Sequence, residues 1–151
     1  MHDTVVYLLS NMPGLPPIVQ TVHLLGIAVI MSSVVLLDLR ILGLALPSQD
    51  VHELTRRVMP WVWWTLPVML LSGSMFVFAR PRRYFTNPIF GLKFALLAPA
   101  IALAAVLHLV SGRKPDSLAT KALAAVSLLL WVGVVLAGRW IAYVDYLFPE
   151  E

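Results

Sequence analysis

The 151-residue sequence contains no cysteine, and only 13% of its residues are charged. The absence of cysteine excludes disulfides, thiolate metal sites, iron–sulfur clusters and covalent haem attachment through a CxxCH motif. Soluble domains average about 25% charged residues, whereas this chain is 60% hydrophobic with a mean hydropathy of +0.85. The composition therefore indicates an integral membrane protein.

The chain also lacks the features that divide a protein into domains or that bind nucleic acid. No Ser/Gly-rich linker, internal repeat or low-complexity tract interrupts it, so we expect residues 1–151 to form a single transmembrane domain. Its net charge of +3 arises from Lys and Arg near the ends of apolar segments, with no basic stripe interleaved with aromatic residues. Such cations suit a lipid bilayer with anionic head groups, and nucleic acid is not expected as a partner.

Long apolar segments take up most of the sequence. A hydrocarbon core about 30 Å thick needs about 20 apolar residues in a helix, and the segment from Ile18 to Leu46 exceeds this with only His23, Asp38 and Arg40 ionisable. The predicted spans are residues 18–46, 60–79, 88–111 and 118–147. Short connections between them favour an all-α, antiparallel four-helix bundle. Residues 1–12 are too short to span and are expected to lie along the membrane interface.

The basic residues are distributed unevenly between the two ends of this bundle. Four spans put both termini at one end, which we call side A, and the opposite end is side B. Six basic residues fall on side B (Arg40, Arg56, Arg57, Arg113, Lys114 and Lys121), three on side A (Arg80, Arg82 and Arg83) and two inside helix ends at side A (Lys93 and Arg139). The positive-inside rule favours a multi-pass protein of the bacterial inner membrane with periplasmic termini.

Three ionisable residues inside the spans share one depth near side A. Spans one and three run from side A to side B and span four returns, so position along each helix gives depth at 1.5 Å per residue. His23, Lys93 and Arg139 then form one layer, which we call the A layer. Two cations and an imidazole without a carboxylate attract an anion. We expect a b-type haem there, with His23 bound to the iron and with Lys93 or Arg139 bound to the propionates or serving as the opposite iron ligand. A quinone head group or an anionic substrate could use the same three residues.

The second layer, which we call the B layer, contains Asp38, Arg40 and His108. Asp38 beside His108 or Arg40 is balanced in charge, which suits a structural ion pair or a proton pathway. Simpler interpretations stay open for both layers: the histidines can bond to backbone carbonyls or water, and Lys93 and Arg139 can extend to lipid head groups. One imidazole per layer also leaves a bis-histidine haem without its second ligand unless a second protomer supplies it.

Several motifs carry a resemblance to known membrane families. The string VHLLGIAVIMSSVVLLDLRILG, the connector RPRRY, and the GLK and GRW motifs resemble a family of small, uncharacterised four-helix bacterial membrane proteins. More distantly, the layout is similar to HemJ-type protoporphyrinogen oxidases and CopD-type copper-resistance membrane domains. In the HemJ type, a His in helix one and a Lys early in helix three are associated with haem. That resemblance implies these roles for His23 and Lys93.

These observations predict a membrane haem protein with a redox role, in electron transfer or in porphyrin- or quinone-linked oxidation, and leave open whether it is an enzyme. One alternative is a non-catalytic scaffold or accessory subunit. Its partner subunit, or a second copy in a homo-oligomer, would pack on Ser72, Gly73 and Ser74 or on Gly133 and Ala137. The other is a small oligomeric transporter or proton pathway through Asp38 and His108.

Overall fold

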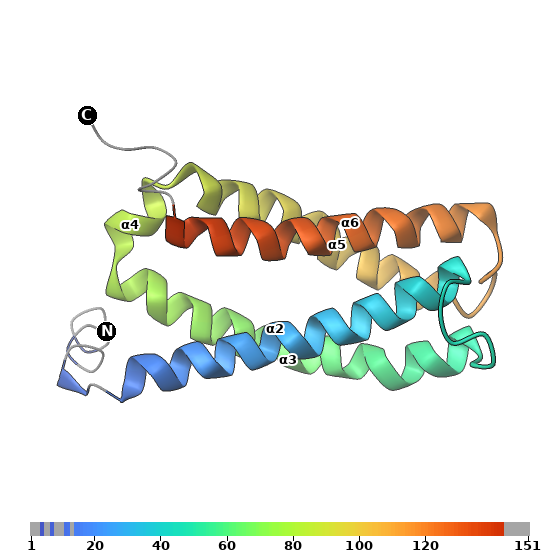
Figure 1. Ribbon diagram of the computed structural model, residues 1–151, viewed down its shortest axis with the longest axis horizontal. Helices are drawn as coiled ribbons and strands as arrows, with labels where there is room; N and C mark the ends of the chain where they lie inside the picture. Colours follow the sequence, from blue (N-terminus) through green and yellow to red (C-terminus); the bar gives the residue numbers. More distant parts are fainter. Residues whose placement is uncertain (1–3, 5–6, 8–10, 13, 144–151) are drawn as a thin grey trace.

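The computed structural model describes residues 4, 7, 11–12 and 14–143, and this part of the chain is helical without strands. The four long helices are α2 (Leu15–Leu42), α3 (Val51–Ala79), α5 (Pro88–Val110) and α6 (Leu118–Trp140). A short helix α4 (Pro81–Phe85) connects α3 to α5, and a 3-10 turn η1 (Ile141–Tyr143) follows α6 (Figure 1). All four long helices have the length and apolar composition to cross a membrane, which confirms the predicted fold class.

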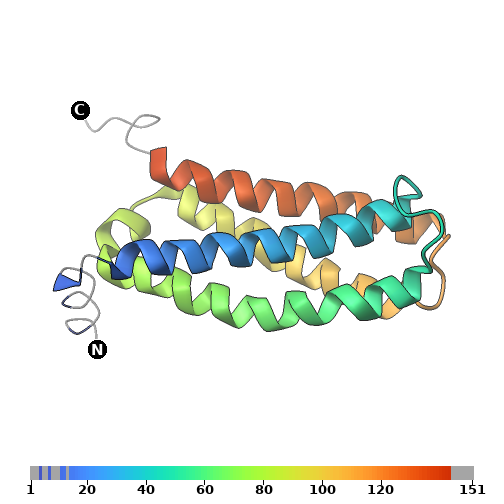
Figure 2. The same cartoon turned by 60° about the horizontal axis from the view of Figure 1, so that its bottom comes forward.

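The long helices form two antiparallel hairpins. Helix α2 packs on α3, helix α5 packs on α6, and the hairpins contact each other mainly through α2 and α6. Helices α2 and α6 converge at the end where α2 finishes and diverge toward the end where it begins (Figures 1 and 2). The converging end, with loops 43–50 and 111–117, is side B, and α4 and η1 lie at side A.

The buried core is concentrated toward side B. Its main cluster draws on all four long helices: Ile30, Val34, Leu37, Ile41, Val51, Leu54, Met59, Val62, Ala100, Ala104, Leu107, Ala124, Trp131 and Val134. No residue of α3 between Val62 and Ser72 is buried, and no residue of α5 between Ile89 and Ala100 is buried. A smaller cluster near side A is formed by Ile89, Ala137 and Ile141, with Tyr84, Phe90 and Leu96 packed against it, and includes no residue of α2 or α3. The hairpins are therefore packed tightly near side B and loosely near side A.

Helix α2 begins at Leu15, three residues before the predicted start of the span at residue 18, and ends at Leu42, four residues before its predicted end at residue 46. The first turn accommodates Pro16 and Pro17 because amides there have no intrahelical partner. At the other end, Gly43 has φ +79°, its N–H donates to the Arg40 carbonyl at 3.1 Å, and the Leu44 N–H donates to the Leu39 carbonyl at 2.9 Å. This left-handed glycine stops the helix before Pro47, where the sequence argument placed the end.

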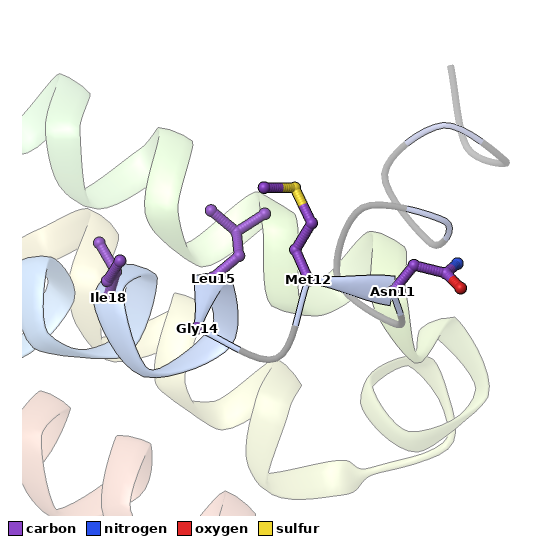
Figure 3. Close-up of a pocket in the computed structure, with 5 residues that line it drawn as sticks. All are labelled: Asn11, Met12, Gly14, Leu15 and Ile18. Atoms are coloured by element: carbon purple, nitrogen blue, oxygen red, sulfur yellow. The ribbon is translucent and has the colours of Figure 1, made fainter.

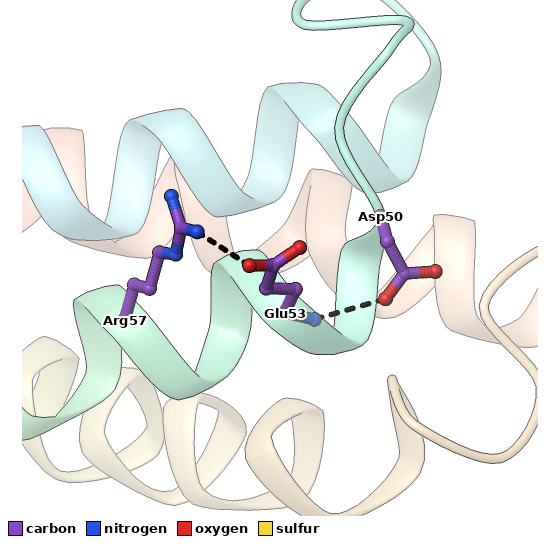
Figure 4. A network of polar contacts seen from close by, with 3 residues as sticks. All are labelled: Asp50, Glu53 and Arg57. Carbon is purple, nitrogen blue, oxygen red and sulfur yellow. Dashed lines mark hydrogen bonds and ion pairs between the residues drawn. The ribbon is translucent and has the colours of Figure 1, made fainter.

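Helix α3 begins at Val51, nine residues before its predicted start at Pro60. The Asp50 carboxylate accepts a hydrogen bond from the Glu53 N–H at 2.9 Å, and the Glu53 side chain pairs with Arg57 one turn on (Figure 4). An aspartate cap and an acidic first turn stabilise a helix N-terminus. Proline is common at helix starts and so suggested Pro60, but Pro60 and Pro67 both lie inside α3.

The bounds of α5 agree with the predicted span 88–111 to one residue, and α6 begins as predicted. Asn87 caps α5 by accepting from the Ile89 N–H at 2.9 Å, and Ser117 caps α6 by accepting from the Thr120 N–H at 3.1 Å. Helix α6 ends at Trp140 rather than continuing to residue 147, and its chain turns into η1. Residues 144–147 and most of the predicted interfacial segment 1–12 lie outside the described residues.

Candidate functional site

His23 of α2 is half-buried and is held by a hydrogen bond from α3. Its Nδ1 lies 2.8 Å from the Ser72 Oγ, and that Oγ lies 2.8 Å from the Val68 carbonyl oxygen. The Ser72 hydroxyl hydrogen points to Val68, so the hydroxyl oxygen accepts from His23 Nδ1–H. In the neutral imidazole this assignment leaves Nε2 unprotonated. The ring therefore presents a free lone pair, because Nε2 makes no hydrogen bond with a described residue.

Helix α3 also shapes the surroundings of the His23 ring. A Cβ placed on Gly73 would lie 3.4 Å from the His23 Cε1, so the glycine lets the imidazole approach the helix. Phe76 lies edge-on to the ring, with 6.2 Å between the ring centroids and an interplanar angle of 86°. Ser72, Gly73 and Phe76 together fix the position and rotation of the imidazole.

Lys93 of α5 lies in the same layer as His23, as predicted from depth. The two groups are close enough for an electrostatic interaction, and the lysine side chain is half-buried against Gly138 of α6. Lys93 forms no hydrogen bond or ion pair with a described residue. The structure therefore brings one imidazole and one unpaired cation together inside the membrane-spanning part of the bundle.

Arg139 has the predicted depth but faces away from His23 and Lys93. Its Nη2 donates to the Tyr143 hydroxyl at 3.1 Å, and its guanidinium lies 5.2 Å from the centre of the Tyr143 ring. The side chain is exposed. Each helical residue is turned about 100° from the one before it, so Gly138 faces Lys93 while Arg139 points to the bundle exterior. The predicted grouping of three residues in the A layer is reduced to two.

The three B-layer residues do not pair with one another. Arg40 donates from Nε to the Gln49 carbonyl oxygen at 2.6 Å, which ties it to the loop that follows α2. His108 is exposed, and its Nδ1 accepts from the Trp63 Nε1–H at 3.4 Å. Asp38 is 1% exposed, and neither of its oxygens has a hydrogen-bond partner among the described residues. The expected partnership of Asp38 with Arg40 or His108 is therefore absent.

Asp38 instead faces α6. Its carboxyl group interacts with the Ser127 side chain, although the two do not form a hydrogen bond of normal geometry. The Ser127 hydroxyl and the Trp131 Nε1 are also buried without a hydrogen-bond partner among the described residues. The sequence analysis did not identify Ser127 or Trp131. Their spacing of four residues, which puts both on one helix face, was the signal that could have indicated them.

Four of the five small residues expected to receive a partner helix contact other helices of this chain. A Cβ on Gly133 would be 3.3 Å from Leu96 of α5, and Ala137 is buried in the cluster with Ile89. On α3, Ser72 and Gly73 contact His23. These four positions take part in packing within one chain, and Ser74 donates to the Leu71 carbonyl oxygen at 2.8 Å.

A shallow hollow of about 410 Å³ lies at the start of α2. Its described lining is Asn11, Met12, Gly14, Leu15 and Ile18 (Figure 3). None of these side chains is ionisable, and neither His23 nor Lys93 belongs to the lining. Elsewhere in the described residues, no group of three His, Asp or Glu side chains is arranged to hold a metal ion. Among the described residues, His23 therefore has no two further His, Asp or Glu side chains beside it to complete a metal site.

Comparison with known proteins assigns the chain to one family. Residues 13–144 match the model of a family of unknown function, DUF6644, so the chain belongs to that family. No curated protein and no solved structure matches the chain.

Proposed function

We propose that this member of the DUF6644 family is a membrane haem protein with a redox role, in which His23 would bind the iron and Lys93 would bind a propionate. The observation that carries the proposal is the hydrogen bond from His23 Nδ1 to Ser72, which leaves Nε2 free. Histidines that bind metals commonly donate the other ring N–H to a neighbouring acceptor, which fixes the tautomer and the ring orientation. Ser72 supplies that acceptor.

Lys93 supports an anionic ligand at the same depth. A lysine inside a membrane-spanning helix costs about 2.5 kcal/mol or more on insertion scales, and such residues usually have a partner. No described carboxylate pairs with Lys93. A haem propionate has the charge to compensate it. When bound, haem supplies one-electron chemistry, which suits electron transfer or a porphyrin- or quinone-linked oxidation.

The bundle has few buried residues near the depth of His23. Around this depth, α3 and α5 contribute few buried residues, and the hairpins share their main cluster nearer side B. The residues that are present fit one histidine ligand, because His108 lies toward side B and is occupied by Trp63. We therefore propose that this chain supplies one histidine ligand to the haem iron.

A visible spectrum of the purified protein tests the proposal. We expect a Soret band, a reduced-minus-oxidised difference spectrum and stoichiometric haem in the wild type, and loss of all three in His23→Ala. The matched control is His108→Ala, which removes an exposed imidazole and keeps the haem. Ser72→Ala removes the Nδ1 acceptor, and changes of this kind commonly weaken binding by about 10–100-fold.

Two outcomes would exclude a haem on His23: a colourless wild type, or a spectrum that His23→Ala leaves unchanged. A colourless protein that copurifies with a stoichiometric membrane partner would favour the accessory-subunit role.

The orientation proposed for the chain puts side B in the cytoplasm. Arg56, Arg57, Arg113 and Lys114 are all exposed at side B, next to the ends of the spans. Positive residues in short connections favour the cytoplasmic face. The redox site at His23 would then lie toward the periplasmic half of a bacterial inner membrane.

A further inference from the structure

Three buried polar groups near side B lack hydrogen-bond partners among the described residues: the Asp38 carboxyl, the Ser127 hydroxyl and the Trp131 indole N–H. Their residues are 1%, 0% and 3% exposed, respectively. Buried polar atoms are nearly always hydrogen-bonded in native proteins, and the requirement is stricter in a membrane, where no water replaces the partner. The three groups are not used by the proposed haem site, so they need an explanation of their own.

The Ser127 hydroxyl differs from the other buried hydroxyls in the long helices. Thr120 donates to the Lys114 carbonyl oxygen at 2.8 Å, and Ser33, Thr55 and Ser72 each donate to the carbonyl oxygen four residues earlier, at 2.9, 2.7 and 2.8 Å. Ser127 does not make that bond, and its side chain interacts with Asp38 instead. Its hydroxyl is therefore available to the carboxyl group across the interface between α2 and α6.

Trp131 lies one turn from Ser127 on the same face of α6 and packs in the same buried cluster as Val34 and Leu37 of α2. Helical side chains lean toward the N-terminus of their own helix. Because α2 and α6 are antiparallel, Asp38 and Trp131 lean toward a common level. A buried indole N–H normally donates a hydrogen bond to an acceptor. The Asp38 carboxyl oxygens are unpartnered acceptors at the same interface between α2 and α6.

No cationic side chain on the surrounding helices compensates a charge on Asp38. Arg40 is bonded to the loop, Arg57 pairs with Glu53, Arg56 is exposed, His108 is bonded to Trp63, and Lys121 forms no ion pair with Asp38. An unpaired carboxylate buried among apolar residues is strongly disfavoured, whereas a neutral carboxylic acid can donate one hydrogen bond and accept others.

We infer that Asp38, Ser127 and Trp131 form an internal proton-binding site in which the Asp38 carboxyl holds the proton. The neutral acid donates to the Ser127 oxygen and accepts from the Trp131 N–H through its carbonyl oxygen. One bound proton then accounts for all of the unpartnered groups without a buried charge. This site is independent of His23, which lies 15 residues earlier on α2, about 22 Å along the helix.

Infrared spectroscopy of the full chain in lipid vesicles at neutral pH tests this inference. A protonated carboxylic acid has a carbonyl stretch that is separate from the amide bands. We expect this band in the wild type and its loss in Asp38→Asn, which keeps the shape of the side chain. Asp50→Asn is the control, because Asp50 is an exposed cap at the aqueous end of α3.

Two further variants test the partners of the proton. Ser127→Ala and Trp131→Phe each remove one hydrogen-bonding group, so each should keep the band and shift its frequency. These variants also keep the inference testable if Asp38→Asn does not fold. Identical carbonyl regions in wild type and Asp38→Asn would show that Asp38 is ionised and would overturn the site. A band that both partner variants leave unshifted would overturn the assignment of Ser127 and Trp131.

Discussion

Gly138 of α6 provides the space in which the side chain of Lys93 lies. A Cβ on Gly138 would be 3.7 Å from the Lys93 Cε and 3.9 Å from its Nζ, both ordinary contact distances. The lysine side chain therefore lies along the backbone of the neighbouring helix at Gly138. The Lys93 side chain is half-buried in a membrane-spanning segment, and its position depends on the size of residue 138.

Enlarging Gly138 is expected to displace Lys93 and to weaken ligand binding at His23. Gly138→Leu should lower the haem content of the purified protein several-fold, because the branched side chain takes the lysine's place. Gly138→Ala should retain haem, since its Cβ makes only normal contacts. The control is Gly91→Leu on α5, where nothing lies within 4 Å. Equal haem content in Gly138→Leu and Gly91→Leu would contradict the role of this contact.

Close packing of α2 on α3 at Gly26 predicts sensitivity to added volume. A Cβ on Gly26 would overlap the Met69 Sδ and lie 3.3 Å from the Thr65 Cγ2. Overfilling a packed site costs about 1–3 kcal/mol, so Gly26→Val should lower the thermal unfolding temperature in detergent, measured by circular dichroism. The second change Met69→Ala should restore part of the loss. A Gly26→Val protein as stable as Gly91→Val would exclude tight packing here.

The cap of α5 is expected to contribute measurably to stability. Asn87 is buried, accepts from the Ile89 N–H, and donates from Nδ2 to the Ile141 carbonyl oxygen at 3.4 Å. Loss of a helix cap typically costs about 1 kcal/mol. Asn87→Ala should therefore unfold at lower denaturant than wild type, and Asn87→Asp should retain most of the stability through its cap. Thr86→Ala, in an exposed neighbour, is the control, and an equal loss there would remove the case for the cap.

The absence of cysteine makes the chain suitable for a direct measurement of orientation. A single cysteine at exposed Ser48 marks side B, and one at exposed Thr86 marks side A. In intact bacterial cells, a membrane-impermeant maleimide should label Thr86→Cys and spare Ser48→Cys, while both should react after the cells are broken. The reverse pattern in intact cells would place side B outside and reject the orientation derived from the basic residues.

Depth in the bundle could be read from the sequence, but the direction of each side chain could not. The rise per residue and the antiparallel order placed His23 and Lys93 in one layer correctly. Arg139 is one residue from Gly138, and that single step decides between the interior and the exposed surface. The helices are apolar on most sides, so hydrophobic periodicity gives little information about which face is buried.

The same limit explains the partners of Asp38 and the start of α3. Asp38 was expected to pair with Arg40 or His108 because they are nearest in sequence or depth, yet its side chain faces Ser127 on a helix that the charge pattern does not single out. The preference of proline for helix starts predicted that α3 begins at Pro60, but the Asp50 cap starts the helix at Val51. Tertiary packing and capping, rather than composition, decide both cases.

The concentration of the core near side B has a structural consequence. The two hairpins share most of their buried contacts where α2 and α6 converge, so separating them at side A would expose little of the main buried cluster. The five-residue helix α4 joins α3 to α5 at side A, so the two hairpins are covalently connected at that end as well. His23, held against α3, and Lys93, held against α6, therefore belong to separate hairpins in the half of the bundle that has the smaller buried cluster.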